Sequence, residues 1–158
     1  PLHQADLPAA GRLCRTLGLM SQHMYVHLKP TGSPSAIHLA KPSRVVLIAE
    51  ASAPSSYREA IARELVESGC LYFMSWGPEC EAWHDEVDIA NIRKFNFEQI
   101  PEDAFVMTTW HERESLSEVF WFCKNNAFHP TVDLKFTVLL HLAPQPNEQE
   151  LLASYAEA

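Results

Sequence analysis

The hydrophobic residues of the chain gather in four short runs, and helix-like segments separate these runs. The runs span residues 44–49, 70–76, 105–110 and 136–142, each of strand length. They are continuous rather than alternating, which is typical of strands buried on both faces of a parallel sheet. Right-handed crossovers in the order β-α-β-α-β-α-β-α place helices on both sides of such a sheet. The pattern therefore predicts an α/β fold, a three-layer sandwich with a mainly parallel sheet of four to five strands.

Polar residues mark the starts of three predicted helices. Ser56 with Glu59, and Ser115 with Glu118, have the spacing of a capping box, in which each side chain bonds the other residue's backbone N–H. Asn147 stands before the last apolar helical segment and is expected to cap it. These signals support the alternation of strands and helices.

The first 42 residues differ from the rest, because proline and glycine interrupt them. We expect residues 1–23 to be a weakly ordered N-terminal extension, with at most a short helix over 13–20. A strand-like piece at 24–28 opens a lead-in that is expected to drape over the domain. We therefore predict one α/β domain over residues 24–158.

The overall composition limits the partners and the location of the protein. The 158 residues are 47% hydrophobic and 20% charged, which is ordinary for one folded domain. The net charge of −8 repels phosphate backbones, so we predict no nucleic-acid binding, and a basic partner fits better. No apolar run approaches the ~20 residues that cross a bilayer. Four cysteines without a CxxC pair, and no secretory pattern at the N-terminus, favour a cytoplasmic protein.

Polar and aromatic residues stand where each apolar run stops. Ligands of open parallel sheets bind beyond the carboxyl ends of the strands, so we expect a binding site on this rim. The predicted ligand-binding residues are Glu50, Trp76, Thr109, Trp110 and His141. The alternative is that polar residues follow the strands because loops are exposed to water.

An acid–base pair is a second interpretation of the same rim. His111 with Glu112 or Asp85 would transfer protons, and Ser75 or Thr109 would be the group acted on. These three residues, His111, Glu112 and Asp85, are the catalytic candidates.

A metal site is a weaker interpretation. His84 and Asp88 are four residues apart and share a helix face, and Asp85 is three residues before Asp88. With His111 and Glu112 they could form a metal site. A solvated acidic helix face explains the same spacing. The chain has no HExxH, GxSxG, P-loop or GxGxxG motif, so we predict no resident metal and no cofactor.

Two further residue types have an ordinary packing interpretation. Trp83 and Trp121 are expected in the core. Cys80 would lie in the first turn of its helix, where the helix dipole and His84 could make the thiol a nucleophile. A small packing residue is the preferred interpretation of Cys80.

The sequence contains three further motifs: Ser68-Gly69-Cys70-Leu71-Tyr72, then Trp76-Gly77 followed by Cys80 and Trp83, and then Met107-Thr108-Thr109-Trp110-His111-Glu112 with Glu118-Val119. Over about residues 24–142, these motifs resemble an uncharacterised bacterial domain family. The resemblance implies a bacterial origin and a shared domain. It implies no activity, because the family has none established.

Two functions from different classes follow from the sequence. The first is a non-catalytic cytoplasmic module that binds a protein or small molecule through the rim. The second is a hydrolase-type or metal-assisted enzyme that uses His111 and Glu112 with His84 and Asp85. A homodimer through a surface rich in tryptophan and phenylalanine is a further prediction.

Overall fold

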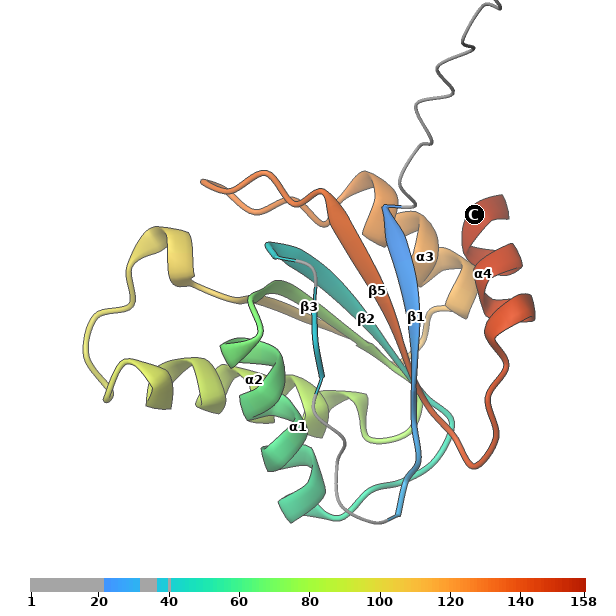
Figure 1. Ribbon diagram of the computed structural model, residues 1–158, viewed down its shortest axis with the longest axis horizontal. Coiled ribbons are helices and arrows are strands. Elements are labelled where there is room, and N and C mark those ends of the chain that lie inside the picture. Colours follow the sequence, from blue (N-terminus) through green and yellow to red (C-terminus); the bar gives the residue numbers. More distant parts are fainter. Residues whose placement is uncertain (1–21, 32–36, 40) are drawn as a thin grey trace, which may run out of the picture.

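The computed structural model describes residues 22–31, 37–39 and 41–158 of the chain. Residues 1–21, where the extension and its short helix are predicted, lie outside the described residues. The described part forms three layers, with one sheet between two pairs of helices (Figure 1).

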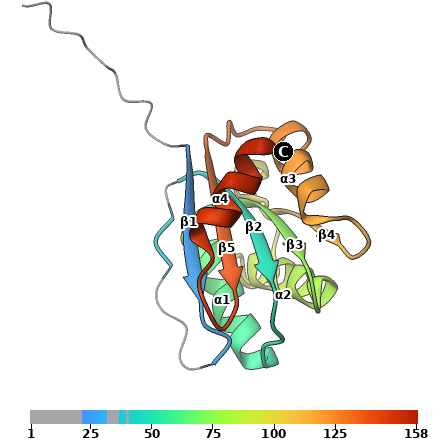
Figure 2. The ribbon, with the colours of Figure 1, turned by 90° about the vertical axis from the view of Figure 1, so that its right-hand side faces the viewer.

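The sheet has five strands and all of them are parallel. They are β1 (His23–Leu28), β2 (Ser43–Ala49), β3 (Cys70–Trp76), β4 (Met107–His111) and β5 (Phe136–Leu142). Their order across the sheet is β1-β5-β2-β3-β4, which Figure 2 shows from left to right. The predicted α/β class, parallel sheet and strand number are confirmed. The piece at 24–28 was expected to drape over the domain, but it is the edge strand β1 and pairs with β5.

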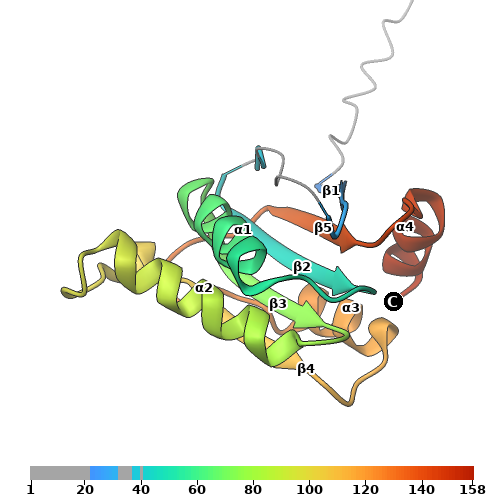
Figure 3. The same ribbon diagram turned by 90° about the horizontal axis from the view of Figure 1, so that it is seen from below.

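Two helices cover each face of the sheet. On one face, α1 (Ser55–Glu67) and α2 (Cys80–Lys94) lie side by side, as Figure 3 shows. On the other face lie α3 (Leu116–Asn125) and α4 (Glu148–Glu157). A short 3₁₀ helix, Glu102–Ala104, precedes β4. No helix in the described ranges is long and apolar enough to cross a membrane.

Each central strand supplies residues to both hydrophobic cores. In β2, Val45 and Leu47 belong to the core under α1 and α2, whereas Val46 and Ile48 belong to the core under α3 and α4. This division follows from the period of two along a strand. All four side chains are completely buried, which explains the continuous apolar run in the sequence.

The predicted helix caps have different outcomes. The Ser115–Glu118 capping box is present at α3. The Ser56–Glu59 box is wrong, because the N-cap of α1 is Pro54, two residues before Ser56, and the helix has no side-chain cap. Asn147 does precede α4, but its side chain bonds the Glu150 carboxylate at 2.8 Å instead of a backbone N–H of the helix.

Gly77 brings two loops of the rim close together. Its φ is +97°, a conformation that side chains with a Cβ rarely adopt. A Cβ at this position would overlap the carbonyl oxygen of Ala49. The turn after β3 therefore packs directly against the end of β2.

Candidate functional site

The strand register aligns one residue from each strand near the carboxyl edge of the sheet. His27 is paired with His141, His141 with Ile48, Ile48 with Trp76, and Trp76 with His111. Paired residues of parallel strands point to the same face of the sheet. We call these five residues the rim row. It faces α3 and α4, because His111 packs its ring 5.0 Å from that of Phe122.

At the centre of the rim row, the connections that follow two neighbouring strands turn to opposite faces of the sheet. β2 and β5 are neighbours, but β2 continues into α1 on one face and β5 into α4 on the other. Such a switch point separates the two loops and is the usual ligand position in open parallel sheets. Glu50 directly follows β2 here, and its backbone N–H donates to the carbonyl of Leu142 at 2.9 Å.

A histidine with no exposed surface occupies this switch point. The Nδ1 atom of His141 lies 2.8 Å from the Tyr25 hydroxyl, which also accepts a 3.0 Å hydrogen bond from the backbone N–H of Asn147. Because the Tyr25 oxygen already has a donor, its own proton can go to Nδ1. That places the ring proton of a neutral His141 on Nε2, on the side of Glu50.

Glu50 faces the other nitrogen of His141. Its Oε2 lies 3.1 Å from Nε2, which is ion-pair distance. The contact does not have hydrogen-bond geometry, however, and the buried Nε2 makes no hydrogen bond with any residue in the described ranges. The Glu50 side chain is 48% exposed. The cluster therefore joins a buried imidazole to a carboxylate that solvent can reach.

Tyr25 lies near two carboxylates, those of Glu50 and Glu148. Burial is the largest cause that raises the pKa of its hydroxyl above the ordinary value. The N–H of Asn147 opposes this shift, whereas the charges of Glu148 and Glu50 add to it. The hydroxyl therefore stays protonated at neutral pH and can act as a hydrogen-bond donor.

His27 ties the edge strand to the loop after β5. Its Nε2 donates to the carbonyl of Ala143 at 2.8 Å, and its ring centre lies 5.9 Å from that of His141. The sequence interpretation missed Tyr25 and His27. Their spacing of two is a signal for one strand face, but it is meaningful only if residues 24–28 are assigned to the sheet.

His111 lies at the far end of the rim row and is nearly buried. Its Nε2 lies 3.0 Å from the Thr109 hydroxyl, and its Nδ1 lies 3.5 Å from a carboxylate oxygen of Glu114. Burial lowers the pKa of the ring below its ordinary value, although the Glu114 carboxylate opposes this shift. Trp76 donates its indole N–H to the backbone carbonyl of Glu114 at 2.9 Å. The carboxylate beside His111 is thus Glu114 rather than the predicted Glu112, which is exposed.

The other predicted residues lie on the opposite face of the sheet. Trp110 packs its ring 4.6 Å from that of His84 on α2, and the neighbouring Thr108 donates to Asp88 at 2.6 Å. His84 lies 3.0 Å from Asp85 and 3.5 Å from Asp88.

The structure therefore does not bring the predicted catalytic residues together. Successive residues of β4 point to opposite faces, so His111 is turned toward α3, whereas His84 and Asp85 lie beside Trp110 on the α2 face. Within the described part of the chain, no group of three or more His, Cys, Asp or Glu residues could hold a metal ion. Glu50 and His141, by contrast, do meet.

The packing predictions have mixed outcomes. Trp83 is completely buried, as predicted, but Trp121 is 53% exposed on α3, so its assignment to the core is wrong. Cys80 is the first residue of α2 and is buried. Burial raises the pKa of its thiol, and the charge of Glu112 adds to the shift, which disfavours a thiolate nucleophile.

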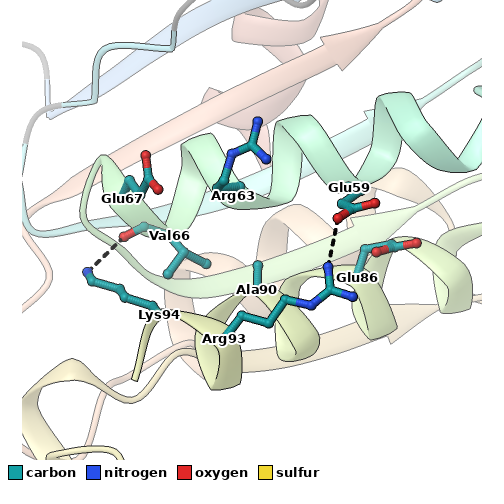
Figure 4. Close-up of a pocket in the computed structure, with 8 residues that line it drawn as sticks. All are labelled: Glu59, Arg63, Val66, Glu67, Glu86, Ala90, Arg93 and Lys94. Atoms are coloured by element: carbon teal, nitrogen blue, oxygen red, sulfur yellow. Dashed lines mark hydrogen bonds and ion pairs between the residues drawn. The ribbon is translucent and has the colours of Figure 1, made fainter. Parts of the chain in front are cut away.

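A separate groove of about 190 Å³ runs between α1 and α2 (Figure 4). Its walls carry charges of both signs. An ion pair of 2.7 Å between Arg93 and Glu59 crosses it, and Lys94 donates to the carbonyl of Val66 at 3.3 Å. No residue of the rim row lines this groove. Three acidic and three basic side chains line the groove, so their formal charges balance.

Comparison with known proteins yields a family but no function. A family model described as "Domain of unknown function (DUF7684)" matches residues 23–158. No curated protein and no solved structure matches the chain.

Proposed function

Because the chain belongs to this family of domains of unknown function, we propose from the site alone that it is a non-catalytic binding module. Its ligand would dock on the rim between β5 and β2. The observation that carries the proposal is the meeting of Tyr25, His141 and Glu50 at the switch point.

The energetics of this cluster favour a binding role. A buried polar group without an aligned partner costs about 1–3 kcal/mol, and His141 Nε2 is such a group. A hydrophobic side chain at this position would avoid that cost. The imidazole instead lies against the half-exposed carboxylate of Glu50, which a bound ligand can reach from solvent.

The setting of this function is also part of the proposal. The resemblance and the absence of a CxxC pair favour a bacterial cytoplasm. The ligand is a small molecule, with no nucleic acid or cofactor involved. The exposed rings of Trp110, Trp121 and Phe128 would support a homodimer.

A fragment screen on the full chain, followed by NMR of backbone amides, tests the binding site. Fragments are expected to shift the signals of Tyr25, Glu50 and His141. Tyr25→Phe removes one hydroxyl and should weaken binding about fivefold, which corresponds to ~1 kcal/mol. Trp110→Ala, on the other face of β4, should leave the affinity at this site unchanged.

Two results would contradict the proposal. One is a screen in which every bound fragment shifts residues other than Tyr25, Glu50 and His141 and their neighbours. The other is a Tyr25→Phe variant that folds and binds the same fragments with unaltered affinity.

A further inference from the structure

We infer that the ligand of this site carries a positively charged N–H group, an organic ammonium, which Glu50 binds. This inference rests on the proposed function, because it names the chemistry of the ligand at the same switch point. It concerns the residues that face the site from β1, β5, the end of β2 and α4.

The first argument is the charge of the site. Two carboxylates, Glu50 and Glu148, act on the Tyr25 hydroxyl from the end of β2 and the first turn of α4. The strands contribute Tyr25, His27 and His141 to the same site. Lys29 follows β1 and is exposed, but no ion pair joins it to Glu50 among the described residues. An anion would meet two carboxylates here and be repelled, whereas a cation would be attracted.

The second argument is the supply of hydrogen-bond acceptors. An ionised carboxylate has about four lone-pair sites and can only accept. In the described ranges, the side chain of Glu50 has His141 as its one close polar partner. An ammonium group has N–H donors for the remaining sites, and charge-assisted bonds of this kind are the strong ones.

The third argument concerns how Glu50 is held. His141 is completely buried, and Tyr25 fixes its ring through Nδ1, so Nε2 stays beside the carboxylate. Burial of the ring leaves Glu50 as the group that reaches solvent. His141 and Tyr25 are thus positioning residues, and Glu50 is the binding residue.

The test uses three small molecules that differ in charge and have alkyl chains of similar length. Butylamine, butanol and butyrate are titrated separately into the full chain, and the shifts of the Glu50 and His141 amides are followed by NMR. Butylamine should bind in the millimolar range, roughly tenfold more tightly than butanol, and butyrate should bind more weakly still. Higher salt should reduce the preference for butylamine.

Matched variants assign the effect to one carboxylate. Glu50→Gln keeps the shape of the side chain and should lower the affinity for butylamine to that for butanol. Glu98→Gln changes an exposed carboxylate in the loop after α2 and should preserve the preference. Amine binding to surface carboxylates in general would make the two variants alike and would overturn the inference.

The outcomes separate this inference from the proposed function. If butanol or butyrate binds beside Glu50 and His141 as tightly as butylamine does, the site exists and the inference is wrong. If none of the three binds while other fragments shift Tyr25 and Glu50, the inference is again wrong and the binding function stands. If no fragment of any charge shifts Tyr25, Glu50 or His141, the proposed function fails as well.

Discussion

At the scale of single residues, His111 shows how burial determines the charge of a side chain. Burial lowers the pKa of its ring, and the Glu114 carboxylate compensates only in part. An unfolded histidine takes up a proton near pH 6.5. Below that pH the unfolded chain therefore binds more protons at this residue than the folded chain does, so the free energy of unfolding falls as the pH falls.

The prediction is that His111→Gln removes part of this pH dependence. Urea unfolding of the wild type and the variant at about pH 7.5 and pH 5.5 measures it. The wild type should lose more stability than the variant on acidification. NMR titration of the His111 ring gives the direct readout, and a pKa above the ordinary histidine value would contradict the prediction.

The residues at the strand ends could be predicted from the sequence better than the contacts between them. Glu50 and His141 were expected on one rim because parallel strands end at the same edge, and they lie 3.1 Å apart. Tyr25 could not be paired with His141 from sequence, because 116 residues separate them and the strand order decides the contact. His111 and Asp85 could not be separated from sequence, because only the alternation along β4 turns His111 to the face opposite α2.

At the scale of elements, the two capping-box patterns make a matched pair. Ser115 bonds the backbone N–H of Glu118, and the Glu118 carboxylate bonds the backbone N–H of Ser115 at 2.7 Å. Ser56 has the same sequence spacing but lies inside α1 and caps nothing. The difference arises because Pro54, with its φ of −59°, occupies the capping position.

Ser115→Ala should lower the free energy of unfolding by about 1 kcal/mol, since a lost N-cap typically costs this much. Ser56→Ala should change it by less than about 0.5 kcal/mol. Urea unfolding followed by circular dichroism measures both. Equal losses in the two variants would show that the cap contributes nothing beyond the removal of a hydroxyl.

Element types were predicted well, and their edges less so. β3 and β5 begin and end where their apolar runs do. The predicted strand at 105–110 begins two residues before β4. Phe105 is hydrophobic, but it lies in the loop before β4 and is 47% exposed. A hydrophobic residue in the loop before a strand cannot be distinguished from a strand residue by its hydrophobicity alone.

At the scale of the whole molecule, one sheet is shared by two hydrophobic cores. Cys70 lies in the core under α1 and α2, and Cys123 lies in the core under α3 and α4. Both side chains are completely buried. Burial raises the pKa of Cys70 to about 12 and that of Cys123 to about 11. Neither thiol is exposed or ionised in the folded protein, so each can report on the opening of its own core.

The two thiols should become reactive in the same unfolding transition. β2 and β5 supply residues to both cores, so neither pair of helices can leave without exposing strands that the other pair also needs. Iodoacetamide labelling across a urea series, resolved by mass spectrometry for each cysteine, measures this. The two labelling curves should have one midpoint. Earlier labelling of Cys123, whose sulfur lies 4.0 Å from the Tyr155 hydroxyl, would show that α4 detaches before the sheet unfolds.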